Sequence, residues 1–84
     1  MSGIETGLYQ HYKGAEYEVL GLVTHSETEE KLVVYRALYG EFGLWVRPLD
    51  MFKESVSING LEQDRFKLIN AYNVELGKHL PSSL

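Results

Sequence analysis

Short runs of apolar and polar residues, separated by turn-forming residues, fill the first half of the chain. Residues 8–12, 16–25 and 44–47 have the length and the tyrosine, valine and leucine content typical of strands. In the run 16–25, both sides of the predicted strand become apolar around Gly21, which indicates a strand bent enough to serve two faces. This half of the chain therefore predicts a small sheet with tight connections.

The second half contains the strongest hairpin signal of the sequence, Asn59-Gly60, because both residues tolerate positive φ. Residues 55–58 precede this pair, and a return strand is expected from Leu61 toward Phe66. The two halves together predict five or six short strands, and a sheet of this size needs closure or a covering element to protect its edges.

Residues 31–39 are open to two interpretations. Ser26 and Glu29 match a helix capping box, and Gly40 would suit a helix end. The Val-Val-Tyr run inside the segment favours a strand instead, and the Gly-Glu-Phe-Gly stretch after it is typical of a hairpin loop. We expect a strand over residues 31–39.

Helical structure is expected at two places. Pro48 ends the preceding strand or places it at an edge of the sheet, because it lacks an amide donor. Residues 48–52 suit one helical turn that places Leu49, Met51 and Phe52 in the core. Apolar residues then recur at helical spacing near the end of the chain, which predicts a short helix over about residues 69–76.

These elements predict an all-β protein: a small five-stranded barrel with one short helical turn and a short C-terminal helix. Residues 8–69 form the expected single domain, and residues 1–7 and 70–84 are expected to be flexible or peripheral. The length of 84 residues permits one domain and no more.

Composition narrows the classes of function. The chain has 8 Lys and Arg against 12 Asp and Glu, a net charge of −4, and no cysteine. Disulfides, thiolate nucleophiles and cysteine-based zinc sites are therefore excluded. No apolar run approaches the ~20 residues of a membrane helix, and no basic-then-apolar leader opens the chain, so we expect a cytoplasmic protein without a membrane partner.

Five linked motifs resemble those of a bacterial family known as domain of unknown function 1653 (DUF1653). In chain order they are Tyr9-Gln10-His11-Tyr12-Lys13-Gly14, His25-Ser26-Glu27-Thr28, Val34-Tyr35-Arg36-Ala37-Leu38-Tyr39-Gly40, Leu44-Trp45-Val46-Arg47-Pro48-Leu49 and Met51-Phe52. The resemblance covers about residues 8–66. It implies an SH3-like barrel, and it brings no activity and no catalytic residue.

The residues themselves favour a non-enzymatic protein. His25, Ser26 and Glu27 are types found in hydrolytic triads, but consecutive residues of an extended chain point to opposite sides and cannot align as nucleophile, base and orienter. No phosphate-binding loop or nucleophile elbow is present, and the three histidines share no metal-ligand spacing. We expect no catalytic residues, no metal and no cofactor.

One group of residues has the chemistry of a binding face. If Leu44 and Val46 face the core, then Arg36, Trp45 and Arg47 share the outer face of the sheet. An arginine beside a tryptophan offers cation–π stacking, and guanidinium groups suit carboxylates or phosphates. We therefore predict a site for an extended peptide or a small acidic ligand, formed by Arg36, Trp45, Arg47, Tyr12 and His25. The alternative is that Trp45 is a core residue and that the arginines pair with carboxylates of neighbouring strands.

Two further partners follow from the same residues. Six tyrosines and one tryptophan offer surfaces for base stacking, so a nucleic-acid or nucleotide-binding domain is the alternative function, although the net charge of −4 opposes binding to a polyanion. The apolar residues Leu76, Leu80 and Leu84 suggest self-association through the tail, residues 70–84.

Overall fold

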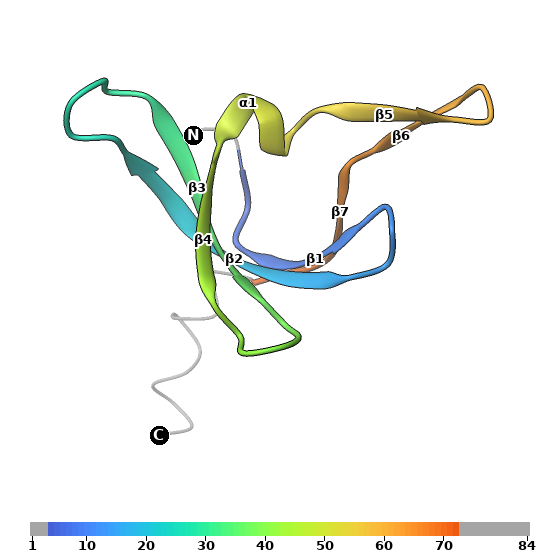
Figure 1. Cartoon of the computed structure of the whole chain (residues 1–84), viewed down its shortest axis with the longest axis horizontal. Coiled ribbons are helices and arrows are strands. Elements are labelled where there is room, and N and C mark those ends of the chain that lie inside the picture. Colours follow the sequence, from blue (N-terminus) through green and yellow to red (C-terminus); the bar gives the residue numbers. More distant parts are fainter. Residues whose placement is uncertain (1–3, 73–84) are drawn as a thin grey trace, which may run out of the picture.

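The structure, a computed structural model that describes residues 4–72, contains one antiparallel five-stranded sheet, one short helix and a separate hairpin (Figure 1). The strands of the sheet are β1 (Gly7–His11), β2 (Glu16–Thr24), β3 (Lys31–Ala37), β4 (Leu44–Pro48) and β7 (Phe66–Ala71). Between β4 and β7 in the chain lie α1 (Leu49–Phe52), β5 (Ser55–Ile58) and β6 (Leu61–Asp64). The spatial order is β4-β3-β2-β1-β7, so the first strand of the chain lies beside the last described one.

Local sequence signals explain most of these elements. The segment from Lys31 to Ala37 is a strand, as its β-branched residues predict. The pairing of β2 with β3 shifts register between Val19 and Gly21, so the ladder is irregular at the place where the sequence predicts a bend. Asn59 and Gly60 adopt φ values of 53° and 81°, so the predicted hairpin turn joins β5 to β6.

The expected SH3-like five-stranded barrel is not confirmed, because the described strands do not close. β4 and β7 are the two edges of an open sheet, and β5 and β6 pair only with each other. The physical reason lies in β6, whose four residues are all exposed and three of which are polar or charged. Such a strand offers no apolar face that could join the core and close the sheet.

The helix expected over residues 69–76 is wrong for its first three residues, which belong to β7; the rest of that range lies mostly outside the described residues. β1 offers an unpaired edge, and β7 pairs with it from Phe66 opposite His11 to Ala71 opposite Gly7. A register shift between Leu8 and Tyr9 interrupts this ladder. Strand pairing has here overridden a helical spacing of apolar residues. The strands of the sheet thus start at Gly7 and end at Ala71, beyond both bounds of the predicted domain, residues 8–69.

The core is largely aromatic and lies on one face of the sheet, which we call the inner face. Its buried members are Tyr9, Val19, Val33, Tyr35, Phe52 and Phe66. The rings of Phe52 and Phe66 stack with centroids 4.1 Å apart, so α1 is fixed against the start of β7. Leu49 packs against this cluster, whereas Met51, also expected in the core, is 43% exposed.

Helix α1 has four residues, and the part of the chain that the structure describes holds no helix long and apolar enough to cross a membrane.

Candidate functional site on the inner face around Arg47

The register of β3 with β4 decides which side chains share a face. Trp45 lies opposite the buried Tyr35, and Arg47 lies opposite the buried Val33. Directly opposed residues of antiparallel strands point to the same side, so Trp45 and Arg47 lie on the inner face. Arg36 lies opposite Leu44 and therefore on the other side, which we call the outer face. The expected common face of Arg36, Trp45 and Arg47 is wrong.

Trp45 lies on the inner face without being part of the core. Its side chain is 59% exposed, because β4 is an edge strand and no further strand among the described residues covers the indole. An exposed tryptophan beside an arginine is a common feature of binding surfaces. The alternative reading of Trp45 as the largest core residue therefore does not hold.

Replacement of Trp45 should leave the stability almost unchanged. We expect Trp45→Ala to change the free energy of unfolding by about 0.5 kcal/mol or less, because the exposed indole contributes little to the core. Urea denaturation followed by circular dichroism measures this change. A loss of about 3–5 kcal/mol, typical of a buried tryptophan, would contradict the exposed position.

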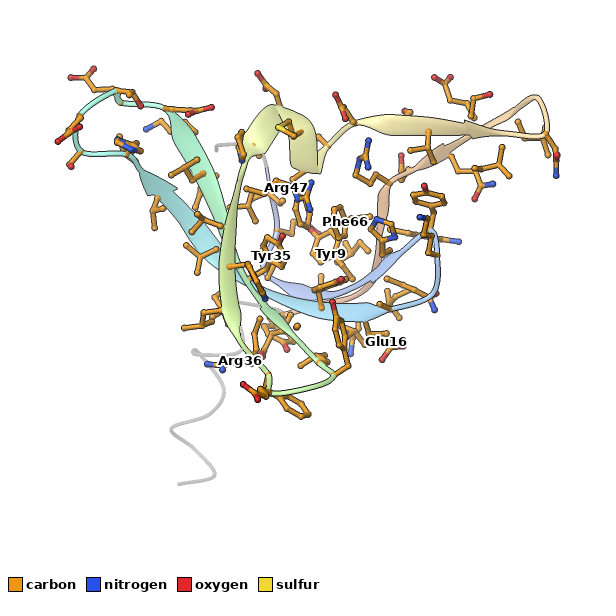
Figure 2. The ribbon with its side chains drawn as sticks, viewed as in Figure 1. Tyr9, Glu16, Tyr35, Arg36, Arg47 and Phe66 are labelled. Carbon is orange, nitrogen blue, oxygen red and sulfur yellow. The ribbon has the colours of Figure 1, made fainter. Side chains whose placement is uncertain are left out.

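Arg47 places a cation above the aromatic core. Its Nε donates a hydrogen bond to the hydroxyl of Tyr35 at 3.3 Å, and its guanidinium carbon lies 5.6 Å from the centroid of the Phe66 ring. Figure 2 shows Arg47, Tyr35, Tyr9 and Phe66 directed into the same space, whereas Arg36 lies away from them. Within residues 4–72 the ion pair is that of Arg65 with Glu54, at 2.9 Å, so Arg47 has no carboxylate partner there.

His11 is a second basic residue of this region, because its side chain and that of Arg47 both contact the ring of Phe66. The imidazole of His11 meets the ring of Phe66 edge-on at 4.9 Å, and its Nδ1 accepts a hydrogen bond from the Lys13 amide at 3.1 Å. Burial and the positive charges of Arg65, Lys13 and Arg47 lower the pKa of His11. Three cationic side chains thus lie near His11 in a protein of negative net charge.

The lowered pKa of His11 predicts a pH dependence of stability. The unfolded chain has the higher pKa, about 6.5, and so binds more protons than the folded chain as the pH falls through this value. The stability contributed by neutral His11 is therefore present above about pH 6.5 and is lost on acidification, until the pH passes below the folded pKa. We expect the His11→Asn variant, whose side-chain oxygen can still accept from Lys13, to lose less stability than the wild type between about pH 7.5 and 5. Denaturation curves across this range test the prediction, and equal losses would contradict it.

Two tyrosines extend the inner face past Tyr35. The hydroxyls of Tyr17 and Tyr39 are 2.7 Å apart, and the ring of Tyr17 packs edge-on against Tyr35. Burial, together with the hydrogen bond to Tyr39, raises the pKa of Tyr17 to about 12. Its hydroxyl is thus neutral at physiological pH and adds no negative charge to the surroundings of Arg47.

The other predicted site residues are not brought to this face. Arg36 donates from Nη1 to the carbonyl oxygen of Phe42 at 2.9 Å, which holds a turn where Phe42 has a φ of 57°. His25 accepts hydrogen bonds through Nδ1 from the amides of Glu27 and Thr28 and so orders the loop between β2 and β3. The ring of Tyr12 packs against that of His11 at a tilt of 32° in the turn after β1, at the border of the site.

Three residues of the site were missed by the sequence reasoning: His11, Arg65 and Phe66. Their contacts depend on β7, because His11 lies opposite Phe66 in the β1–β7 pairing and the amide of Tyr12 donates to the carbonyl of Arg65 at 2.9 Å. A helical interpretation of the chain after Phe66 hides that pairing. No local motif marks these residues as neighbours.

Two clefts border the inner face without including Arg47 or Trp45. One has a volume of about 560 Å³ and is lined by Ile4, Glu5, Tyr9, Phe52, Lys53, Asp64 and Phe66. The other has a volume of about 740 Å³ and is lined by Gln10, His11, Tyr12, Gly14, Ser55, Glu62, Gln63, Asp64 and Lys67. Trp45 is 59% exposed on the edge strand β4, and a surface of this kind suits an extended ligand better than an enclosed one.

Metal ligation finds no support in residues 4–72, where no group of three or more histidine, aspartate or glutamate side chains could hold an ion.

Comparison with known proteins gives the chain a family. The sequence profile described as "Protein of unknown function (DUF1653)" matches residues 7–68. A crystal structure of a DUF1653 protein from Bordetella bronchiseptica is similar, with 36% sequence identity, a TM-score of 0.74, and coverage of 83% of this chain and 92% of that one. No protein with a curated description matches. The profile match and the structural similarity together show that this chain belongs to the DUF1653 family.

Proposed function

We propose that the protein is a non-enzymatic binding module whose inner face takes an extended peptide with an acidic side chain. The observation that carries the proposal is Arg47. Its guanidinium lies over the ring of Phe66, is held by Tyr35 and has no carboxylate partner among the described residues. A carboxylate is the natural complement of such a group, because guanidinium and carboxylate form paired, charge-assisted hydrogen bonds.

The geometry of β4 favours an extended ligand. Trp45 and Arg47 are two residues apart on one face of an edge strand, so a peptide in extended conformation meets both with alternate side chains. Peptides commonly add to exposed sheet edges, where main-chain hydrogen bonds supply affinity and alternate side chains supply specificity. An acidic residue would then reach Arg47, and an apolar residue two positions away would cover the indole of Trp45.

A nucleic-acid ligand is the competing interpretation, since Trp45 and Tyr39 are exposed aromatic residues that could stack on bases. The net charge of −4 opposes it, because a polyanion is repelled by the protein as a whole. The two ligands differ in salt response. Affinity for a single strand falls steeply with ionic strength, whereas an aromatic and single-carboxylate contact depends on it weakly.

Chemical-shift mapping distinguishes these proposals. The isotope-labelled chain is titrated with short peptides that place Glu two residues from an apolar residue, with peptides that carry Gln instead, and with a single-stranded oligonucleotide at two salt concentrations. We expect the Glu peptides to shift the amides of β4 and the side chains of Trp45 and Arg47, and the Gln peptides to bind more weakly. Stronger, salt-sensitive binding of the oligonucleotide at the same residues would favour the nucleic-acid function, and no shift with any probe at millimolar concentration would contradict both.

A further inference from the structure

The outer face of the sheet carries an apolar patch that no described element covers. It is formed by residues of three adjacent strands, β2, β3 and β4, and we call it the outer patch: Leu20, Val23, Leu32, Val34, Leu44 and Val46. Leu44 and Val46 are 56% and 57% exposed, and Leu20 and Val23 are each 42% exposed. A contiguous apolar surface of this kind is unusual on a soluble monomer and marks a surface that something covers.

The patch is open at its centre. Gly21 lies within it, opposite Val34, and a side-chain carbon added to Gly21 would have no neighbour within 4 Å. The outer face thus has room for another segment of chain directly over β2 and β3. Its polar border lies at one end, where Glu18 and Arg36 are opposite each other in the β2–β3 pairing.

The described chain ends on this same face. Tyr72 follows β7, and its amide donates to the carbonyl of Thr6 at 2.9 Å. Its hydroxyl donates to Oε2 of Glu18 at 2.6 Å, so the side chain crosses β1 and reaches β2 at the polar border of the outer patch. The described chain therefore ends beside the outer patch.

The sequence that follows has the composition and length to cover the patch. Residues 73–84 contain four large apolar residues, Val74, Leu76, Leu80 and Leu84. Twelve residues span up to about 40 Å when extended. The distance across the sheet from β7 to β4 is four strand spacings, or about 19 Å. A tethered segment also has an effective concentration in the millimolar range, which favours docking within one chain over docking on a second copy.

We propose that residues 73–84 dock on the outer patch of their own chain, with leucine side chains over Val34, Leu44 and Val46. This assigns the tail to the face opposite Arg47, so it does not depend on the proposed function. It differs from the self-association predicted from the sequence, because the covered surface belongs to the same molecule.

Paramagnetic relaxation tests this assignment on the full-length chain, which has no cysteine and therefore accepts one spin label cleanly. A nitroxide attached to the Ser82→Cys variant should broaden the methyl signals of Val34, Leu44 and Val46 more strongly than those of Val19 and Val33 on the inner face. The labelled control carries Leu76→Asp and Leu80→Asp in addition, and we expect the selective broadening to disappear. Folding of both variants is checked by the amide spectrum.

Three outcomes would overturn the proposal. The first is equal or absent broadening on the two faces in the folded, labelled chain. The second is selective broadening that survives the two aspartate substitutions. The third is selective broadening in a mixture of two proteins, one isotope-labelled without a nitroxide and the other nitroxide-labelled without isotopes. That result would place the tail on a second copy.

Discussion

Phe52→Ala should nearly unfold the protein. The side chain of Phe52 is 2% exposed, it stacks on Phe66, and it meets Tyr9 edge-on at 5.4 Å. Truncation of such a side chain removes its burial and leaves a cavity, which costs about 3–5 kcal/mol. A small domain has few kcal/mol of net stability to lose. We therefore expect a broad, early urea transition or a spectrum of an unfolded chain at 25 °C.

The neighbouring residue provides the control for Phe52. Met51 belongs to the same helix α1 but is 43% exposed, so Met51→Ala should change the free energy of unfolding by about 0.5 kcal/mol. Equal losses of stability in the two variants would show that burial does not determine the cost of truncation. An unfolding midpoint of Phe52→Ala at the urea concentration of the wild type would also contradict the prediction, because α1 would then not stabilise the core.

Gly7→Ala should disrupt the pairing of β1 with β7. Gly7 has a φ of 149°, and a side-chain carbon at this position would lie 2.5 Å from the carbonyl oxygen of Asn70 and 2.9 Å from the Cα of Ala71. These are backbone atoms of the paired strand, so they cannot move without breaking the ladder. Strain in the backbone and overpacking together should cost about 3 kcal/mol or more.

Gly21→Ala is the matched control, because a side-chain carbon there meets nothing within 4 Å. We expect its stability to equal that of the wild type or to exceed it slightly, since alanine restricts the unfolded chain. Hydrogen exchange should show lost protection at the amides of β7 in the Gly7 variant alone. Wild-type protection of β7 in the Gly7 variant would show that this strand does not depend on a close approach to β1.

The sequence predicted individual strands well where local chemistry dominates. Asn59-Gly60 produced its hairpin, because both residues adopt the positive φ values that the turn needs. The helical turn after Pro48 is similar, since Pro48 directly precedes α1 and Phe52 is the buried residue of this helix. These features need no information from distant parts of the chain.

The face of β4 could not be predicted in the same way. Leu44, Trp45 and Val46 are all apolar, so the strand has no contrast between an inner and an outer side, and a shift by one residue exchanges its faces. The observed register puts Arg47 with Val33 and Arg36 with Leu44. This register depends on the turn between β3 and β4, where Phe42 has positive φ, and apolar residues alone do not encode it.

The pairing of β7 with β1 could also not be predicted from local sequence patterns. It joins the first and last strands of the described chain, and the register shift near Leu8 and Tyr9 hides the alternation expected of a strand. The contacts around Arg47 follow from this pairing, because it brings Phe66 beside His11 and under the guanidinium of Arg47. The contacts between distant segments thus could not be predicted, whereas the alternation within β4 was enough to place Trp45 and Arg47 on one face.

The measurement that tests the central claim most directly compares two arginines of the same sheet. Arg47→Gln and Arg36→Gln remove one guanidinium each, from the inner face and from the outer face. Calorimetric titration with the Glu-containing peptide should show a loss of affinity of about 10- to 100-fold for Arg47→Gln, the equivalent of one charged hydrogen bond of 1.5–3 kcal/mol. Arg36→Gln should bind as the wild type does. Equal affinities of the two variants, or a greater loss in Arg36→Gln, would contradict the assignment of ligand binding to the inner face.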